Sequence, residues 1–178
     1  MGCNCYQVGY YLQMYSIIIN METNNQLQMK QLFQLSGHKH GVAVQGDENL
    51  NFINGSQDDI LHSWSKETKL KSVQAHQDII REILPSPLGG YLTCSNDQTI
   101  KLRSNDLELI QTFLGHKSFG FTMKVHMDQL ISGGKDRLVN IWNLNGNPKQ
   151  TIQLPDAVLS VAINNYKDII IGTSDGKV

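Results

Sequence analysis

Gly115-His116-Lys117-Ser118-Phe119 opens a segment that continues with Leu130-Ile131-Ser132-Gly133-Gly134-Lys135-Asp136 and closes with Val139-Asn140-Ile141-Trp142. Asp136 stands between two strand-like runs, so it is expected in a tight turn. Asp58, Asp97 and Asp175 have the same setting, and each turn aspartate lies 39 residues from the next. This spacing indicates an internal repeat of about 40 residues, and the rest of the chain is interpreted against it.

A repeat of this length that begins with Gly-His and ends with Ile-Trp is typical of one blade of a WD-repeat β-propeller. The sequence therefore predicts an all-β fold with about four consecutive blades, two of them partial. The expected blades are residues 37–74, 75–114, 115–153 and a truncated 154–178. Residues 1–36 are expected to be a degenerate lead that ends in the outer half of a blade, because two β-rich runs there flank a polar turn.

The composition excludes several classes of partner. The 178 residues carry a formal net charge of -1, and 17% of them are charged, so no basic surface for nucleic acid is expected. Cys3, Cys5 and Cys94 form no regular framework, which favours a reducing compartment, the cytoplasm or the nucleus. The apolar run from Val8 to Ile19 is too short and too interrupted to span a membrane.

The polar residues of the repeat allow a catalytic and a structural interpretation. His116, Ser132 and Asp136 have the residue types of a nucleophilic triad. Likeness to WD-repeat blades implies instead a buried chain in which the indole of Trp142, a strand hydroxyl, an imidazole and a turn carboxylate bond one another. The structural interpretation is favoured, and no enzyme is expected, because the set recurs in degraded copies along the chain.

The other copies of this set are incomplete to different degrees. The first blade carries His38, Asn54, Asp58 and Trp64, whereas the second carries His76, Thr93 and Asp97 with Arg103 in place of the Trp. The fourth has Pro155 for the His and Ile171 for the hydroxyl, and it keeps only Asp175.

Two other constellations have simpler explanations. Cys3-Asn4-Cys5 and His38-Lys39-His40 contain zinc-ligand types, but each pair is spaced more tightly than is usual for zinc, so neither a metal nor another cofactor is expected. Tyr10, Tyr11 and Tyr15 lack the interleaved Lys or Arg of a base-stacking platform, and strand packing is their expected role.

In WD-repeat propellers, three side chains of each blade reach the narrow top face. They lie three and five residues after the blade's His and one residue before its turn Asp. These offsets select Phe119, Phe121 and Lys135; Ile79, Arg81 and Asn96; Gly41, Ala43 and Gln57; and, as best equivalents, Ala157, Leu159 and Ser174. The set predicts an apolar patch with a charged rim, as in a recognition surface. Strand alternation places Phe119 and Phe121 on one face, where exposure is favoured over packing between blades.

Longer motifs resemble one family in particular, the phospholipase A-2-activating proteins. The motifs are Cys94-Ser95-Asn96-Asp97 with Thr99-Ile100, Gly115-His116-Lys117-Ser118-Phe119, Asp136-Arg137 before Ile141-Trp142, Gln150 to Pro155 and Asp168 to Gly176. His76 to Arg81 is similar as well, and Arg103 and Leu154-Pro155 fall where that family departs from the repeat consensus. The resemblance covers residues 37–178 and is strongest from residue 76 onward.

The resemblance implies a seven-bladed propeller of which this chain holds the last blades, in an open arrangement rather than a closed ring of four. It also implies a non-catalytic adaptor whose propeller top binds ubiquitin or ubiquitinated proteins, in proteasomal degradation and ubiquitin recycling. The family's domains that engage the valosin-containing AAA ATPase are absent here, so that partner does not carry over. The alternative is a generic WD-repeat scaffold with a peptide partner other than ubiquitin.

Overall fold

The computed structural model describes residues 15–19, 29–34, 38, 42–47, 51–164 and 166–178. Within these residues the chain forms sixteen strands and no helix. Accordingly, this part of the chain contains no helix that is long and apolar enough to cross a membrane. The strands are β1 (Tyr15–Ile19), β2 (Met29–Gln34), β3 (Val42–Gly46), β4 (Asn51–Ser56), β5 (Ile60–Ser65), β6 (Thr68–Gln74), β7 (Ile80–Pro85), β8 (Tyr91–Ser95), β9 (Thr99–Arg103), β10 (Leu109–Leu114), β11 (Gly120–His126), β12 (Gln129–Gly134), β13 (Leu138–Asn143), β14 (Pro148–Gln153), β15 (Val158–Ile163) and β16 (Ile169–Thr173).

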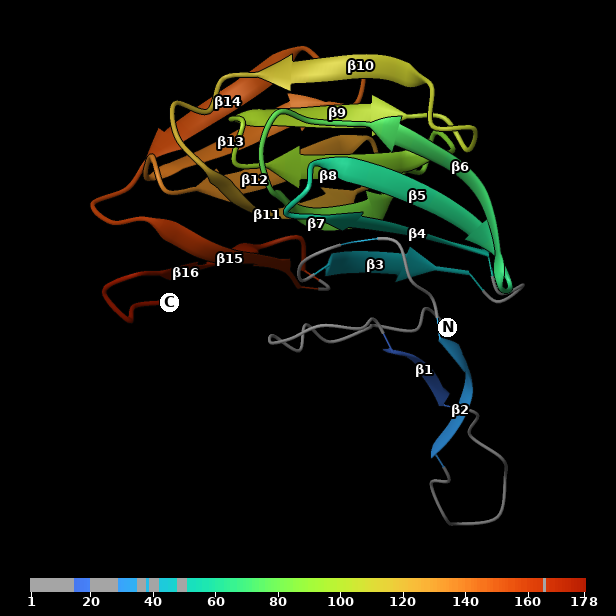
Figure 1. The fold of residues 1–178 in the computed structure, drawn as a ribbon. Coiled ribbons are helices and arrows are strands. Elements are labelled where there is room, and N and C mark those ends of the chain that lie inside the picture. The colour runs from blue at the N-terminus through green and yellow to red at the C-terminus, as the bar shows by residue number, and fades with distance from the viewer. Residues whose placement is uncertain (1–14, 20–28, 35–37, 39–41, 48–50, 165) are drawn as a thin grey trace.

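Consecutive strands pair in antiparallel order to form the blades. The sheets β3 to β6, β7 to β10 and β11 to β14 have four strands each, and β15 and β16 form a two-stranded sheet. The first strands of these sheets, β3, β7, β11 and β15, are neighbours in that order, while β6, β10 and β14 lie at the outer edges (Figure 1). The prediction of an all-β WD-repeat propeller is confirmed, and the number of blades agrees with it.

Apolar layers between neighbouring sheets form the core. Phe113 of the second sheet meets Trp142 of the third edge to face, with ring centroids 5.8 Å apart. The first and second sheets share a cluster that includes Leu61 and Ile80, and the third and fourth share one that includes Val139 and Val158. Each blade therefore buries its apolar faces against the next, as expected for a repeat architecture.

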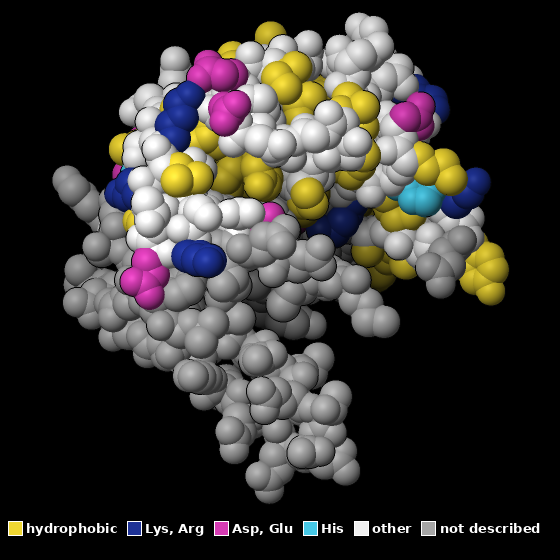
Figure 2. Space-filling view, turned by 90° about the vertical axis from the view of Figure 1, so that its right-hand side faces the viewer, with side chains coloured by type: hydrophobic (Ala, Val, Ile, Leu, Met, Phe, Trp, Pro, Cys, Tyr) yellow, Lys and Arg dark blue, Asp and Glu magenta, His cyan; other side chains and the backbone are white. Residues whose placement is uncertain are grey.

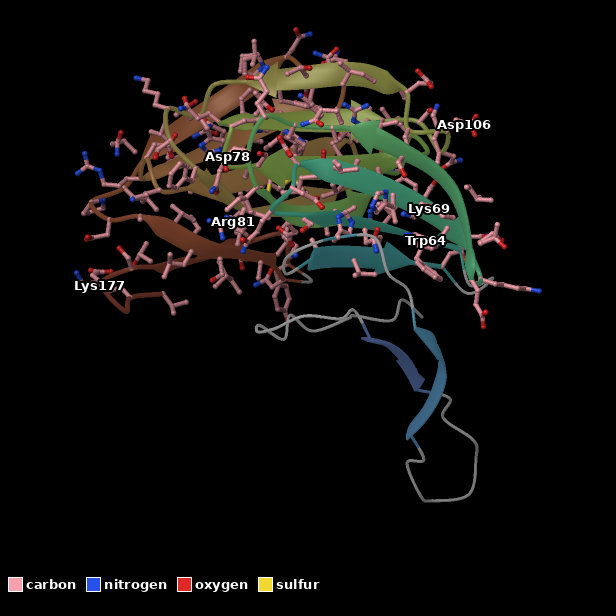
Figure 3. All side chains as sticks on the ribbon, in the orientation of Figure 1. Trp64, Lys69, Asp78, Arg81, Asp106 and Lys177 are labelled. Atoms are coloured by element: carbon pink, nitrogen blue, oxygen red, sulfur yellow. The ribbon has the colours of Figure 1, made fainter. Side chains whose placement is uncertain are left out.

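The two ends of the blades differ. The top end, as we call it, contains the starts of the first strands, the loops before them and the turns of the aspartates. The bottom end contains the turns that join the first strand of each sheet to the second and the third to the fourth. In Figure 3 the labelled Asp78, Arg81 and Lys177 lie toward the left, at the top end, and Lys69 and Asp106 lie toward the right, at the bottom end.

A β-bulge interrupts the first strand of three sheets near the top end. Ile80 pairs with Ser95 and Glu82 with Cys94, which leaves Arg81 unpaired. The register shifts in the same way around Phe121 in β11 and around Leu159 in β15. The regular alternation on which the expected common face of Phe119 and Phe121 rested is interrupted in the backbone at this bulge, and because the side chain of Phe121 lies outside the described part, the common face stays a prediction.

The N-terminal strands form a separate hairpin. β1 pairs antiparallel with β2, with Tyr15 opposite Gln34 and Ile19 opposite Met29. This two-stranded sheet is distinct from the sheet of β15 and β16. The structure thus does not join the two pairs into one four-stranded blade.

Candidate interaction surface at the top end

In the third blade a chain of hydrogen bonds links the strands β12 and β13 to the loop before β11 and to the turn of Asp136. Trp142 Nε1 donates to Ser132 Oγ over 3.0 Å, and Ser132 Oγ lies 2.8 Å from His116 Nε2. His116 Nδ1 lies 2.9 Å from an oxygen of Asp136. Because a carboxylate only accepts, Nδ1 carries the proton and Nε2 accepts from the hydroxyl. Ser132 is only 1% exposed, so a substrate cannot reach its oxygen and this trio does not form a nucleophilic site.

The first blade contains the same chain, with an amide in place of the hydroxyl. Trp64 Nε1 donates to Asn54 Oδ1 over 3.1 Å, and His38 Nε2 lies 3.1 Å from the same oxygen. The other ring nitrogen of His38 lies 2.9 Å from the Asp58 carboxylate. Asn54 Oδ1 thus lies within hydrogen-bond distance of both the Trp64 indole and the His38 ring.

The second blade keeps the His and Asp pair but not the indole. His76 Nδ1 lies 2.8 Å from Asp97, and Nε2 lies 2.8 Å from the Thr93 hydroxyl. Burial lowers the pKa of His76 and outweighs the opposing effect of Asp97. Burial by itself would raise the pKa of Asp97, but the hydrogen bonds from His76 and Thr99 hold it well below its usual range.

Arg103 occupies the position of the missing Trp and uses different acceptors. It is 7% exposed, and its guanidinium donates to the carbonyl oxygens of Leu107 and Ala75 over 2.8 and 3.0 Å. Its Nε has no hydrogen-bond partner in the described part of the chain. The Arg103 side chain therefore connects the turn between β9 and β10 to the loop before β7, and it makes no hydrogen bond to Thr93 in the described part of the chain.

In the fourth blade Asp175 is held only locally. It accepts hydrogen bonds from Thr173 Oγ1 over 2.6 Å and from Lys177 Nζ over 2.5 Å. These bonds lower its pKa to about 2. Pro155 and Ile171 have no side-chain donor or acceptor, so the fourth blade lacks the chain of hydrogen bonds that the third blade has between its strands and the turn aspartate.

Beside these chains, the predicted top-end residues meet in equivalent pairs. The amide of Lys135 donates to the carbonyl of Phe119, that of Asn96 to Ile79, and that of Ser174 to Ala157, each over 2.9 Å. In the second, third and fourth blades, one backbone hydrogen bond thus joins the loop before the first strand to the turn after the second. The sequence offsets selected both partners of each pair.

Side-chain contacts extend two of these pairs. Lys135 Nζ lies 5.2 Å from the centroid of the Phe119 ring, a cation–π contact. Arg81 Nε donates to the Oδ1 of buried Asn96 over 2.8 Å, which fixes the direction of the bulged residue. In the fourth blade, Leu159 is 53% exposed at its own bulge. The result is a set of oriented basic and apolar side chains at the top end.

The remaining predicted top-end residues are less informative. Ala43 is half-buried against the core, and Gln57 is exposed next to a sheet start that has no bulge. Gly41 lies outside the described residues, as does the side chain of Phe121. The sequence also offers residues for a zinc site and for a base-stacking platform, although it favours neither. Of these residues, only His38 and the backbone of Tyr15 belong to the described part of the chain.

Sequence reasoning missed Glu82, which follows the bulge in β7. Its carboxylate accepts the backbone amide of Met123 over 2.5 Å, and Lys124 Nζ lies 3.3 Å from its other oxygen. Both partners lie in β11, so Glu82 links adjacent inner strands directly beside Arg81. A charged residue at an otherwise inward-facing strand position was the available signal.

Comparisons with known proteins agree with this architecture. The WD domain, G-beta repeat family matches residues 67–104 and 107–143, and each match contains the outer strand of one sheet and the three inner strands of the next. The ubiquitin homeostasis protein lub1 of Schizosaccharomyces pombe is 39% identical over 115 residues, which are 63% of this chain and 16% of that protein.

Solved structures show the same fold. The crystal structure of the WD40 beta propeller domain of Doa1 is 31% identical, with a TM-score of 0.74 over 80% of this chain and 51% of that one. The computationally designed protein Ika8, at 17% identity, has a TM-score of 0.75 over 84% of this chain and 48% of its own. The chain thus spans about half of the Doa1 domain and a sixth of lub1. The matched repeats, the blade structure and these two relatives confirm the resemblance of this chain to the WD-repeat propellers of the phospholipase A-2-activating protein family.

Proposed function

We propose that this chain is a non-catalytic WD-repeat adaptor whose top end binds ubiquitin or ubiquitinated proteins. The likeness to lub1, which is described as a ubiquitin homeostasis protein, supports the ubiquitin partner. A role in ubiquitin-dependent proteasomal degradation and ubiquitin recycling, in the cytoplasm and nucleus, belongs to the same proposal. An AAA ATPase would be engaged only through domains other than these blades.

The observation that carries the proposal is the oriented set at the top end. Lys135 lies over the Phe119 ring, Arg81 is fixed by Asn96, and Leu159 is exposed at an equivalent bulge. Aromatic and Arg anchors that are already held in place lose little side-chain freedom on binding. The polar groups with catalytic residue types are meanwhile engaged inside the blades.

Titration of ¹⁵N-labelled ubiquitin with the full chain tests the proposal. Because such surfaces are modest in area, we expect a dissociation constant in the micromolar range, on the order of 10⁻⁵ M. Phe119→Ala and Arg81→Ala should each weaken binding about tenfold. Leu109→Ala is the matched control, since this side chain is also half exposed, at 52%, but lies on the outer strand β10.

Unchanged affinity for both top-end variants would reject the site. Absence of any shift with the wild-type chain would reject ubiquitin as the partner and favour the second candidate, a WD-repeat scaffold for another peptide. That candidate is supported by the same side chains, because apolar anchors with a basic rim do not by themselves specify ubiquitin.

A further inference from the structure

The bottom end carries a repeated turn that the sequence does not reveal. The turns that join β7 to β8 and β15 to β16 have the same backbone hydrogen bonds, from Ser86 N to Gly90 O and from Asn164 N to Asp168 O, over 3.0 and 3.1 Å. In both, the side chain of the first turn residue accepts a further amide: Ser86 Oγ from Leu88 and Asn164 Oδ1 from Tyr166. Leu88 and Tyr166 therefore occupy equivalent positions.

These turns present large apolar side chains to solvent. Leu88 is 65% exposed and Tyr166 87% exposed. The shorter turn between β11 and β12 presents Met127, which is 65% exposed and has a positive φ of 53°. Figure 2 looks onto this end, where hydrophobic side chains gather over the upper and right-hand parts. Three neighbouring blades thus each expose a large apolar residue in the turn between their first and second strands.

A cavity of about 250 Å³ lies between the third and fourth blades at this end. Ile131, Ile163 and Ile169 supply apolar walls, and Met127, His126 and Asp128 border it. The Nε2 atom of His126 is buried and has no hydrogen-bond partner within the described residues. The space is smaller than a typical cofactor pocket and suits one side chain of a partner.

The turns beside the cavity carry two carboxylates and one ammonium group, and Asp128 and Lys167 line the cavity itself. Asp128 and Asp168 lie in the two turns beside it, and Lys167 is the one cation of these turns in the described part of the chain. Asp168 accepts a hydrogen bond from Asn164, whereas among the described residues no hydrogen bond or ion pair engages the exposed carboxylate of Asp128. A cationic side chain next to an apolar one would therefore find both an acceptor and a cavity.

We propose that the bottom end is a second docking surface, which binds a short basic and apolar segment of a partner protein. One apolar side chain of the segment fills the cavity beside Met127. An adjacent Lys or Arg pairs with Asp128, and the rest of the segment crosses toward Tyr166. This surface lies at the opposite end from the proposed ubiquitin site, so neither proposal depends on the other.

Selection of phage-displayed random dodecapeptides on the full chain tests this proposal. We expect enrichment of peptides in which an apolar residue is flanked by Lys or Arg, and fluorescence polarisation should then show at least fivefold weaker binding to Met127→Ser and to Asp128→Lys. Asp156→Lys, a matched charge reversal in a top-end loop, should bind the same peptides unchanged. Thermal unfolding of each variant verifies that it is folded.

Three results would overturn the proposal. They are the failure of any peptide family to enrich, the enrichment of acidic or uncharged peptides instead, and equal binding of the selected peptides to the wild-type chain and to both bottom-end variants. Loss of binding in Asp156→Lys alone would place the peptides at the top end and would equally contradict it.

Discussion

The second blade differs from the third at two neighbouring positions. In the third blade a Cβ on Gly115 would lie 2.6 Å from the Trp142 ring, so the residue before the His must be Gly if the indole is to fit. In the second blade Ala75 precedes the His and Arg103 replaces the Trp. The Ala75 carbonyl accepts hydrogen bonds from Arg103 and from Lys101, over 3.0 and 2.8 Å. With Arg103 in place of a Trp, the Ala75 methyl group has room, and the Ala75 carbonyl serves as an acceptor for the buried cation.

This coupling gives a prediction for two substitutions. Arg103→Trp alone should lower the free energy of unfolding by about 1–3 kcal/mol, because the indole overpacks against the Ala75 methyl group. Ala75→Gly together with Arg103→Trp should recover this loss, since the ring then has space and its N–H can reach Thr93. Urea denaturation of the wild type, both single variants and the double variant measures the coupling, and additive effects would contradict it.

The second-blade His and Asp pair makes stability depend on pH. The pKa of His76 is lowered from its ordinary value of 6.5, mainly by burial, so between these two pKa values the unfolded chain binds more protons than the folded chain. Its contribution is thus complete above pH 6.5 and is lost as the pH falls toward the lowered value. The lowered pKa of Asp97 adds a further loss below its ordinary value of 3.8.

We therefore expect the urea midpoint to fall steadily when the pH is reduced from 7.5 to 5, and to fall further below pH 4. His76→Asn should flatten the first part of this profile. A midpoint that stays constant or rises on acidification would contradict the assignment.

At the scale of the blade, the hydrogen-bonded chain from Trp142 to Asp136 acts as an internal strut. Asp136→Ala should lower the free energy of unfolding by about 2–3 kcal/mol, because it leaves the buried His116 without its acceptor. Asp175→Ala is the matched control at the equivalent turn, where no His is present, and it should leave the urea midpoint almost unchanged. Equal effects of the two substitutions would show that the strut does not stabilise the blade.

The sequence predicts some elements of the blades and not others. The fixed spacing of 39 residues located the turn aspartates, and with them the strands and the top-end pairs. The bulges at Arg81, Phe121 and Leu159 were not predicted, because they depend on pairing between strands rather than on residue type. The equivalence of Leu88 and Tyr166 was hidden because Ser86 and Asn164 form the same turn with different side chains.

In the whole molecule, the hydrogen-bonded chains of three blades lie between the two ends. Within the described residues, the His, Asp and strand polar groups of these chains bond strands, loops and turns to one another, and the oriented side chains at the top end lie outside them. Glu82 adds a link between inner strands next to Arg81, so the top-end residues of neighbouring blades are held relative to one another. Such a framework favours binding through preorganised side chains.

Hydrogen exchange of the full chain with and without saturating ubiquitin tests whether the top end binds ubiquitin. We expect slower exchange in the loops 75–79 and 115–119 and in the turns 96–98 and 135–137, with no change in the turns 86–90 and 127–128. Protection confined to the bottom-end turns, or no protection anywhere, would contradict it.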